Sequence, residues 1–210
     1  MIKRIIAAAF LAAILALTLS CAAGGGANGG TSGGVETETA EFTVGDKVYR
    51  TTEAETDTVL IMTSAGNIII ELYPDIAPIT VANFKSLVAR HYYDGTIFHR
   101  VIENFMIQGG QGATSVPQIK GEFSANGVQN DLKHVRGVVS MARAKSMDSA
   151  SSQFFICHGD AAWLDGQYAA FGRVIFGMDA VDKIAVTQTD SNDRPLTDQV
   201  IINVLFLTAE

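Results

Sequence analysis

From Thr58 onward the chain alternates short apolar runs with polar breaks, and most of the runs have the length of β-strands. The first two runs flank a Gly-bearing turn at 64–66, which predicts a hairpin. The predicted strands are 59–62, 67–72, 96–101, 105–108, 138–142, 153–157, 169–174 and 199–207. Helical spacing of apolar residues appears at 79–90, after Pro78, and at 178–185. Many short strands with two helices predict a mainly β domain over residues 57–210, either an antiparallel barrel or a sandwich.

The first 56 residues follow a different pattern. Lys3 and Arg4 precede an apolar run at 5–19 that is shorter than the about 20 residues of a membrane-spanning helix. These proportions are typical of a secretory signal, so we predict a signal peptide at 1–20. Residues 21–56 are first Gly-rich and then acidic. We predict that they form a flexible tether without a core, although a short strand within 42–49 is an alternative.

The two cysteines stand in different surroundings. Cys21 follows the sequence LTLS, which resembles the lipobox of bacterial lipoproteins, with Leu four rather than three places before the Cys. This resemblance implies that Cys21 becomes the first mature residue and carries lipid, at the extracytoplasmic face of the cell membrane. Cleavage near Ala22 or Ala23, which would give a secreted soluble protein, and an uncleaved anchor are the alternatives. Cys157 lies in an apolar run and is predicted to be a small buried side chain.

The charge and the polar residues exclude several classes of function. A net charge of -7 without a basic run beyond Lys3 and Arg4 argues against nucleic acid, since phosphate binding needs clustered Lys and Arg. The four histidines lack a metal-ligand spacing such as H-x-x-x-H. The adjacent pair Cys157 and His158 has no recognisable third catalytic member. We therefore predict no metal, no cofactor and no hydrolase triad.

Three motifs carry a resemblance to a known family. Residues 98–110 read FHRVIENFMIQGG, residues 152–156 read SQFFI, and the segments 163–166 and 171–174 read WLDG and FGRV. In order and spacing they resemble the FHRVIxxFxxQGG, SQFFI, WLDG and FGKV segments of the cyclophilin-type peptidyl-prolyl cis–trans isomerases. The resemblance extends over residues 58–207. It implies an eight-stranded antiparallel β-barrel capped by two α-helices.

Isomerisation of an X–Pro bond needs neither a nucleophile nor a metal, because the barrier of about 20 kcal/mol comes from amide resonance. It needs a donor that binds the lone pair of the prolyl nitrogen and so takes it out of conjugation. Arg100 suits this task, since its guanidinium stays charged and offers several directed donors. The resemblance implies the same catalytic role. A surface Arg in a strand is the alternative.

The resemblance also implies which residues bind substrate. They are Phe105, Met106, Gln108, Ala142, Arg143, Ala144, Gln153, Phe155, Trp163, Leu164 and Tyr168. By pattern alone the Phe, Met and Leu side chains would be assigned to the core. Gln108 and Gln153 lie inside apolar runs, so each is either a structural brace or a ligand contact. The family counterpart of Gln108 bonds the substrate carbonyl and positions the Arg.

Some positions depart from the family pattern. Tyr168 stands where the family often has His, Arg143 replaces Asn in an A-N-A segment, and the loop 110–121 is short. The implied partners are proline-containing polypeptides, above all exported proteins during folding, and cyclosporin-like ligands. We expect a monomer. The competing hypotheses are a proline-segment binding or chaperone module with little catalysis, and a purely structural lipoprotein.

Overall fold

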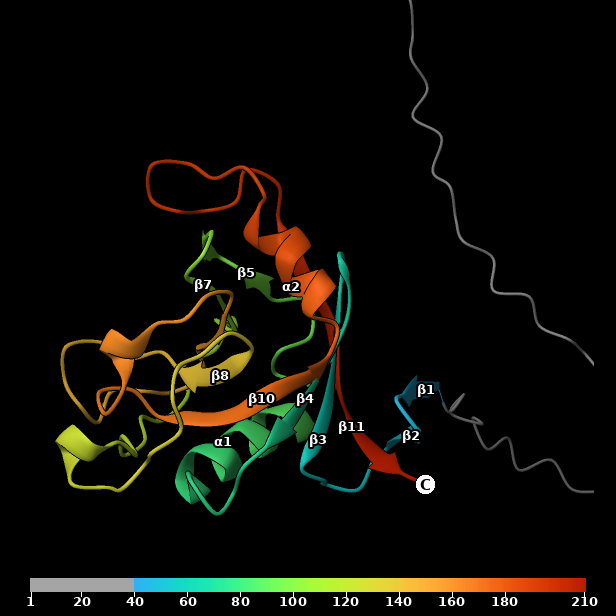
Figure 1. Ribbon diagram of the computed structural model, residues 1–210, viewed down its shortest axis with the longest axis horizontal. Helices are drawn as coiled ribbons and strands as arrows, with labels where there is room; N and C mark the ends of the chain where they lie inside the picture. Colours follow the sequence, from blue (N-terminus) through green and yellow to red (C-terminus); the bar gives the residue numbers. More distant parts are fainter. Residues whose placement is uncertain (1–39) are drawn as a thin grey trace, which may run out of the picture. The chain divides into compact units, whose positions relative to one another are not determined.

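Antiparallel pairing of short strands organises residues 40–210, the part of the chain that the computed structural model describes (Figure 1). The strands are β1 (Glu41–Val44), β2 (Lys47–Thr52), β3 (Thr58–Thr63), β4 (Gly66–Leu72), β5 (Ile97–Phe98), β6 (Arg100–Ile102), β7 (Met106–Gly109), β8 (Val138–Met141), β9 (Phe154–Cys157), β10 (Ala170–Phe176) and β11 (Gln199–Ala209). They follow the order β1-β2-β11-β3-β4-β10-β8-β9-β7-β6. Two α-helices, α1 (Pro78–Ala89) and α2 (Met178–Ala185), and two short 3-10 helices, η1 (Ser124–Asn126) and η2 (Ala162–Leu164), complete the fold.

One segment pairs with two strands, β11 and β7, that are far apart in the order of the sheet. The run predicted as a single strand is divided at His99: β5 pairs with β11, whereas β6 pairs with β7. The sheet is therefore barrel-like but is not closed by one continuous ladder. The prediction of a mainly β, barrel-like domain with two helices is confirmed. The eight expected strands are β3 to β11 with β5 and β6 counted together, and β1 and β2 are additional.

The main core lies on the inner face of the sheet. Alternate residues of β3 and β4, such as Val59 and Ile70, contribute to it, together with apolar residues of both helices. Phe84 of α1 packs on Phe154 and Phe171, with ring centroids 5.5 and 5.2 Å away. The helix predicted at 79–90 lies within one residue of α1, and the helix predicted at 178–185 coincides with α2.

The tether predicted for residues 21–56 is wrong for its final part, because β1 and β2 form a hairpin that continues the sheet. β2 pairs with the end of β11, where Tyr49 lies opposite Ala209. The side chain of Tyr49 is buried against Leu60, Ile69 and Leu207. These residues alternate with the inner-face residues, so the hairpin covers an apolar patch on the outer face. The domain therefore begins near residue 40 rather than 57.

The predicted signal peptide and Cys21 lie outside the described residues. Within residues 40–210, neither helix has the length and apolar composition needed to cross a membrane.

A distant loop fixes the start of α1. Its first position is Pro78, and no side chain of its own caps the helix. The buried carboxylate of Glu122 accepts hydrogen bonds from the backbone N–H groups of Ile79 and Thr80 at 3.0 and 2.7 Å. A carboxylate at this end also interacts favourably with the helix dipole. The contact ties the long loop between β7 and β8 to the helix.

Candidate active site

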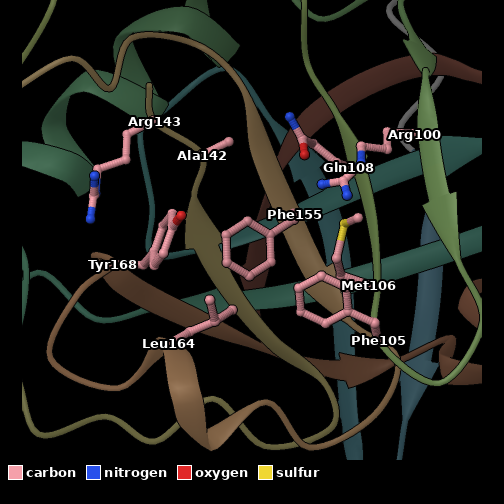
Figure 2. A pocket seen from close by; sticks show the side chains of 9 residues that line it. All are labelled: Arg100, Phe105, Met106, Gln108, Ala142, Arg143, Phe155, Leu164 and Tyr168. Carbon is pink, nitrogen blue, oxygen red and sulfur yellow. The ribbon is translucent and has the colours of Figure 1, made fainter. Parts of the chain in front are cut away.

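A pocket opens beside β6, β7 and β9, and all of its lining side chains belong to the predicted site (Figure 2). The lining residues are Arg100, Phe105, Met106, Gln108, Ala142, Arg143, Phe155, Leu164 and Tyr168. The cavity has a volume of about 120 Å³. That is below the roughly 300 Å³ at which pockets for drug-sized ligands begin. It therefore fits one side chain of a longer partner.

Strand register explains why motifs far apart in sequence meet here. Arg100 lies opposite Gln108 in the β6–β7 pair, and Gln108 lies opposite Phe155 in the β7–β9 pair. Directly opposed residues project from the same face of a sheet, so these three side chains form one row across three strands. Met106, two residues before Gln108, lies on the same face.

Arg100, the predicted catalytic residue, has a partner that sequence reasoning missed. The Nε–H of Arg100 donates to Oδ2 of Asp193 at 3.2 Å. Figure 2 shows the guanidinium extending towards Met106 and the middle of the pocket. Asp193 lies between α2 and β11, outside all three motifs, and no local pattern distinguishes it from the other acidic residues of that loop.

Two glutamine amides, one in the pocket lining and one in an adjoining hollow, bond one another. Nε2 of Gln108 donates to Oε1 of Gln153 at 2.9 Å, and Nε2 of Gln153 lies 3.4 Å from Oε1 of Gln111. Among residues 40–210 the Arg100 side chain bonds Asp193 and not Gln108. Each glutamine therefore braces the other in the free protein. Nε2 of Gln108 keeps a second N–H, since an amide carries two donors.

Apolar side chains form the floor of the pocket. Met106, Phe155 and Leu164 are buried and belong to an apolar cluster separate from the main core. They are thus held by packing and still present a surface to the cavity.

A strained turn sets the position of Phe105. Asn104 has a φ of 61°, in the left-handed region that Asn tolerates better than most residues. Its N–H donates to Nδ1 of His158 at 2.8 Å, and the N–H of His158 donates to the carbonyl of Phe105 at 2.9 Å. The Phe105 ring packs against Trp163 with centroids 5.4 Å apart. Trp163 is 61% exposed and lies at the rim rather than in the lining.

A buried chain of hydrogen bonds supports Phe155 from behind. The ring of His134 stacks on Phe155, with centroids 6.1 Å apart. Its Nδ1 lies 3.0 Å from Oδ1 of Asp165, and its Nε2 lies 3.0 Å from Oγ of Ser140. A carboxylate only accepts, so Nδ1 carries the hydrogen and Nε2 of the neutral ring accepts from the hydroxyl.

The hydrogen bonds link Ser140, His134 and Asp165 in the same succession as in a hydrolase triad, an arrangement that sequence reasoning did not anticipate. However, Ser140 and His134 are buried, so a substrate has no access to the Ser140 hydroxyl. Burial lowers the pKa of His134, and the hydrogen bond and charge of Asp165 offset part of this shift. We interpret this series of hydrogen bonds as a structural support for Phe155 in the pocket wall.

Two of the departures from the family pattern, Arg143 and Tyr168, contact one another. The guanidinium of Arg143 lies over the ring of Tyr168, 4.6 Å from its centroid, and over Phe123 at 5.2 Å. Its Nε–H donates to the carbonyl of Gln167 at 3.0 Å. Tyr168 in turn meets Phe155 edge to face at 6.0 Å. Arg143 thus holds the Tyr168 wall of the pocket in place.

Two further predicted residues, Ala144 and Gln153, line an adjoining hollow and not the pocket itself. The N–H of Ala144 donates to Oγ of Ser149, and its carbonyl accepts from Nη1 of Arg143, both at 3.0 Å. Its backbone groups are therefore engaged within the protein.

The remaining polar chemistry near the pocket is limited. Burial raises the pKa of the Cys157 thiol to about 12, which makes it a weak nucleophile. Within the described part of the chain, no group of three or more His, Cys, Asp or Glu side chains is arranged to hold a metal ion.

Several known proteins resemble this chain in sequence. The family model named "Cyclophilin type peptidyl-prolyl cis-trans isomerase/CLD" matches residues 58–205. A peptidyl-prolyl cis-trans isomerase of Acinetobacter baylyi is 50% identical over 145 residues, which cover 63% of this chain and 74% of that protein. One of Schizosaccharomyces pombe is 43% identical over 156 residues, or 71% of this chain and 98% of the relative.

Solved structures give the same result for the fold. A cyclophilin type peptidyl-prolyl cis-trans isomerase of Cryptosporidium parvum superposes with a TM-score of 0.65 at 31% sequence identity. The superposition covers 71% of this chain and 96% of that one.

Proposed function

Because the chain belongs to the cyclophilin-type peptidyl-prolyl cis–trans isomerases, and is thus an enzyme that interconverts the two forms of X–Pro bonds, we propose that Arg100 and its pocket perform the reaction. The observation that carries this proposal is the row of Arg100, Gln108 and Phe155 across three paired strands. The row puts a permanent cation, an amide and an apolar ring on one face of a small cavity.

Arg100 lowers the barrier by stabilising the twisted peptide bond. The uncatalysed reaction takes about 10–100 s at 25 °C, so turnover in milliseconds requires the barrier to fall by about 5–6 kcal/mol. In the planar amide the nitrogen lone pair is conjugated with the carbonyl; in the twisted state it is free to accept a hydrogen bond. A guanidinium aimed at that nitrogen therefore binds the transition state better than either ground state.

The apolar floor holds the proline ring while the rest of the bond rotates. Met106, Phe155 and Leu164 are buried and ordered before substrate arrives, so little side-chain freedom is lost on binding. In the Cryptosporidium parvum relative, a structure was determined in the presence of the dipeptide Ala-Pro. We extend this ligand chemistry to the present pocket, whose volume of about 120 Å³ suits one ring.

Gln108 contributes a directed donor next to Arg100. One N–H of its amide is used by Gln153, and the other is assigned to a carbonyl of the bound peptide. Ala142 and Arg143 form the far side of the pocket, with Tyr168 taking the place of the usual His. Trp163 extends the apolar surface beyond the rim through its contact with Phe105.

A binding module that holds proline segments without catalysis is the competing function. Exchange NMR on an Ala-Pro-containing peptide distinguishes the two with residues 40–210, which belong to one compact unit. An isomerase accelerates exchange when the peptide is in large excess over protein. Broadening that requires stoichiometric protein, with no catalysed exchange, would instead support the binding module.

We further propose that the chain is exported and anchored by lipid on Cys21, and that its substrates are exported proteins that fold near the membrane. The support comes from the sequence: a basic start, an apolar run at 5–19 and LTLS before Cys21. A secreted soluble protein is the alternative.

Radioactive palmitate labelling of the full chain in a bacterial host tests the anchor. The wild type should be labelled and remain with membranes, while Cys21→Ala should be unlabelled. A Cys157→Ala variant is the matched control and should be labelled like the wild type. Equal labelling of the wild type and Cys21→Ala would refute lipidation. An unlabelled wild type whose mature N-terminus lies beyond Cys21 would refute it as well.

A further inference from the structure

The loop between α2 and β11 places a carboxylate beside Arg100, one of the residues that line the pocket. Oδ2 of Asp193 accepts from Nε of Arg100 at 3.2 Å, and the two side chains are 41% and 44% exposed. Since the contact uses Nε, the two terminal nitrogens of the guanidinium are left to face the pocket (Figure 2). Within residues 40–210, this is the carboxylate that pairs with Arg100.

Backbone hydrogen bonds hold Asp193 in place relative to β6. Its carbonyl accepts from the N–H of Val101 at 2.8 Å, so one residue contacts both the strand and the side chain of Arg100. Its φ is 64°, a left-handed conformation that Asp and Asn tolerate best among residues other than Gly. Asp190 closes the turn by accepting from the N–H of Asp193 at 3.1 Å and, through Oδ1, from that of Asn192 at 2.8 Å.

We propose that Asp193 is a positioning residue that fixes the guanidinium of Arg100 in the orientation that reaches the prolyl nitrogen. This inference rests on the catalytic role proposed above for Arg100. A free Arg side chain has many rotamers, and fixing one of them costs entropy. An ion pair formed before substrate binds removes this cost from the transition state. It leaves the donors that contact substrate unoccupied, so it restrains Arg100 without competing with the peptide.

Two substitutions remove the carboxylate while keeping the turn. Asp193→Asn and Asp193→Gly both suit a positive φ, so the loop conformation is retained. An exposed ion pair has a modest energy, and we expect kcat to fall about three- to fivefold with an unchanged KM. Asp198→Asn is the matched control: Asp198 lies in the same loop, is 60% exposed and pairs with Arg194 at 3.5 Å. It removes the same charge without touching Arg100 and should leave kcat unchanged.

The Arg100→Ala background separates positioning from a general effect on the fold. In the full chain, purified in detergent and assayed at raised enzyme concentration, Asp193→Asn should cause no further loss once Arg100 is absent. High salt should lower the wild-type kcat towards that of Asp193→Asn, because exposed pairs are screened.

The outcomes distinguish this inference from the proposed function. A fully active Arg100→Ala variant would refute the catalytic role itself. If Arg100→Ala is inactive but Asp193→Asn and Asp193→Gly keep or exceed the wild-type kcat, only the positioning role is refuted. A rise in KM alone, or an equal loss in both backgrounds, would also overturn it.

Discussion

The β1–β2 hairpin is expected to stabilise the domain, and Tyr49→Ala tests this directly. Tyr49 is 5% exposed and packs on Leu60, Ile69 and Leu207, which are fully buried. Truncating a buried aromatic side chain to Ala costs about 3–5 kcal/mol through lost transfer energy and the cavity left behind. Because the hairpin lies at the edge of the sheet and can partly collapse, we expect the lower end, about 3 kcal/mol.

This loss converts into a measurable melting temperature. For a domain of this size each kcal/mol corresponds to roughly 2–4 °C, so Tyr49→Ala should melt about 6–12 °C below the wild type. Circular dichroism melts of residues 40–210 measure the difference. The same variant should keep its kcat/KM at 25 °C, since β1 and β2 contribute nothing to the pocket lining.

Arg50→Ala is the matched control from the neighbouring position of β2. Arg50 is 45% exposed and pairs with Glu41 at 3.4 Å and Glu210 at 2.9 Å. At about 0.5 kcal/mol for each exposed ion pair, the two pairs together contribute about 1 kcal/mol, so this melting temperature should fall by only about 2–4 °C. If Tyr49→Ala melts within 2 °C of the wild type, as a flexible tether would predict, the assignment of the hairpin to the domain is wrong.

Three further predictions concern the buried groups and the rim. With Cys157 as the sole thiol of residues 40–210, a thiol reagent at pH 8 should react only after unfolding in urea, and rapid reaction in buffer would contradict its raised pKa. Burial lowers the pKa of His134 below its ordinary 6.5, so near and below pH 6.5 the unfolded chain binds more protons than the folded one, and the free energy of unfolding should fall on acidification. The difference between the urea midpoints at pH 7.5 and pH 5.5 should therefore be smaller in His134→Gln than in the wild type. An equal difference in the two proteins would exclude His134 as the cause. Trp163→Ala should change stability by less than about 0.5 kcal/mol and raise KM about two- to tenfold at constant kcat, whereas an unchanged KM would remove Trp163 from the site.

Sequence reasoning located the pocket because its residues come from segments with strong local signals. Arg100 and Gln108 lie within one motif, and the alternation of strands places both on one face. Phe155 belongs to a second motif, and the family resemblance assigns both motifs to one site, as the strand register does. Pattern alone would have placed Phe155 in the core, which is partly correct, because it is buried as well as part of the pocket lining.

The contacts missed by sequence reasoning join segments that have no signal in common. Asp193 lies 93 positions from Arg100, in a loop with several acidic residues and no motif. The segment 41–52 is predicted as a tether, with a short strand within 42–49 as the alternative, because charged residues interrupt its short apolar alternation. Its stability depends on Leu60, Ile69 and Leu207, which the domain already presents on its outer face. Such tertiary complementarity is not encoded in any local window.

The rate of X–Pro isomerisation by Arg100→Ala, compared with Arg100→Lys and the wild type, tests the central claim most directly. Exchange NMR on an Ala-Pro peptide with residues 40–210 gives kcat/KM for all three. Loss of a directed donor to a transition state typically costs about 10²- to 10³-fold, so we expect a fall of at least about 100-fold for Ala. Lys keeps the charge without the planar fork of donors and should recover little activity. An Arg100→Ala variant within threefold of the wild type, with an unchanged melting temperature, would contradict the account.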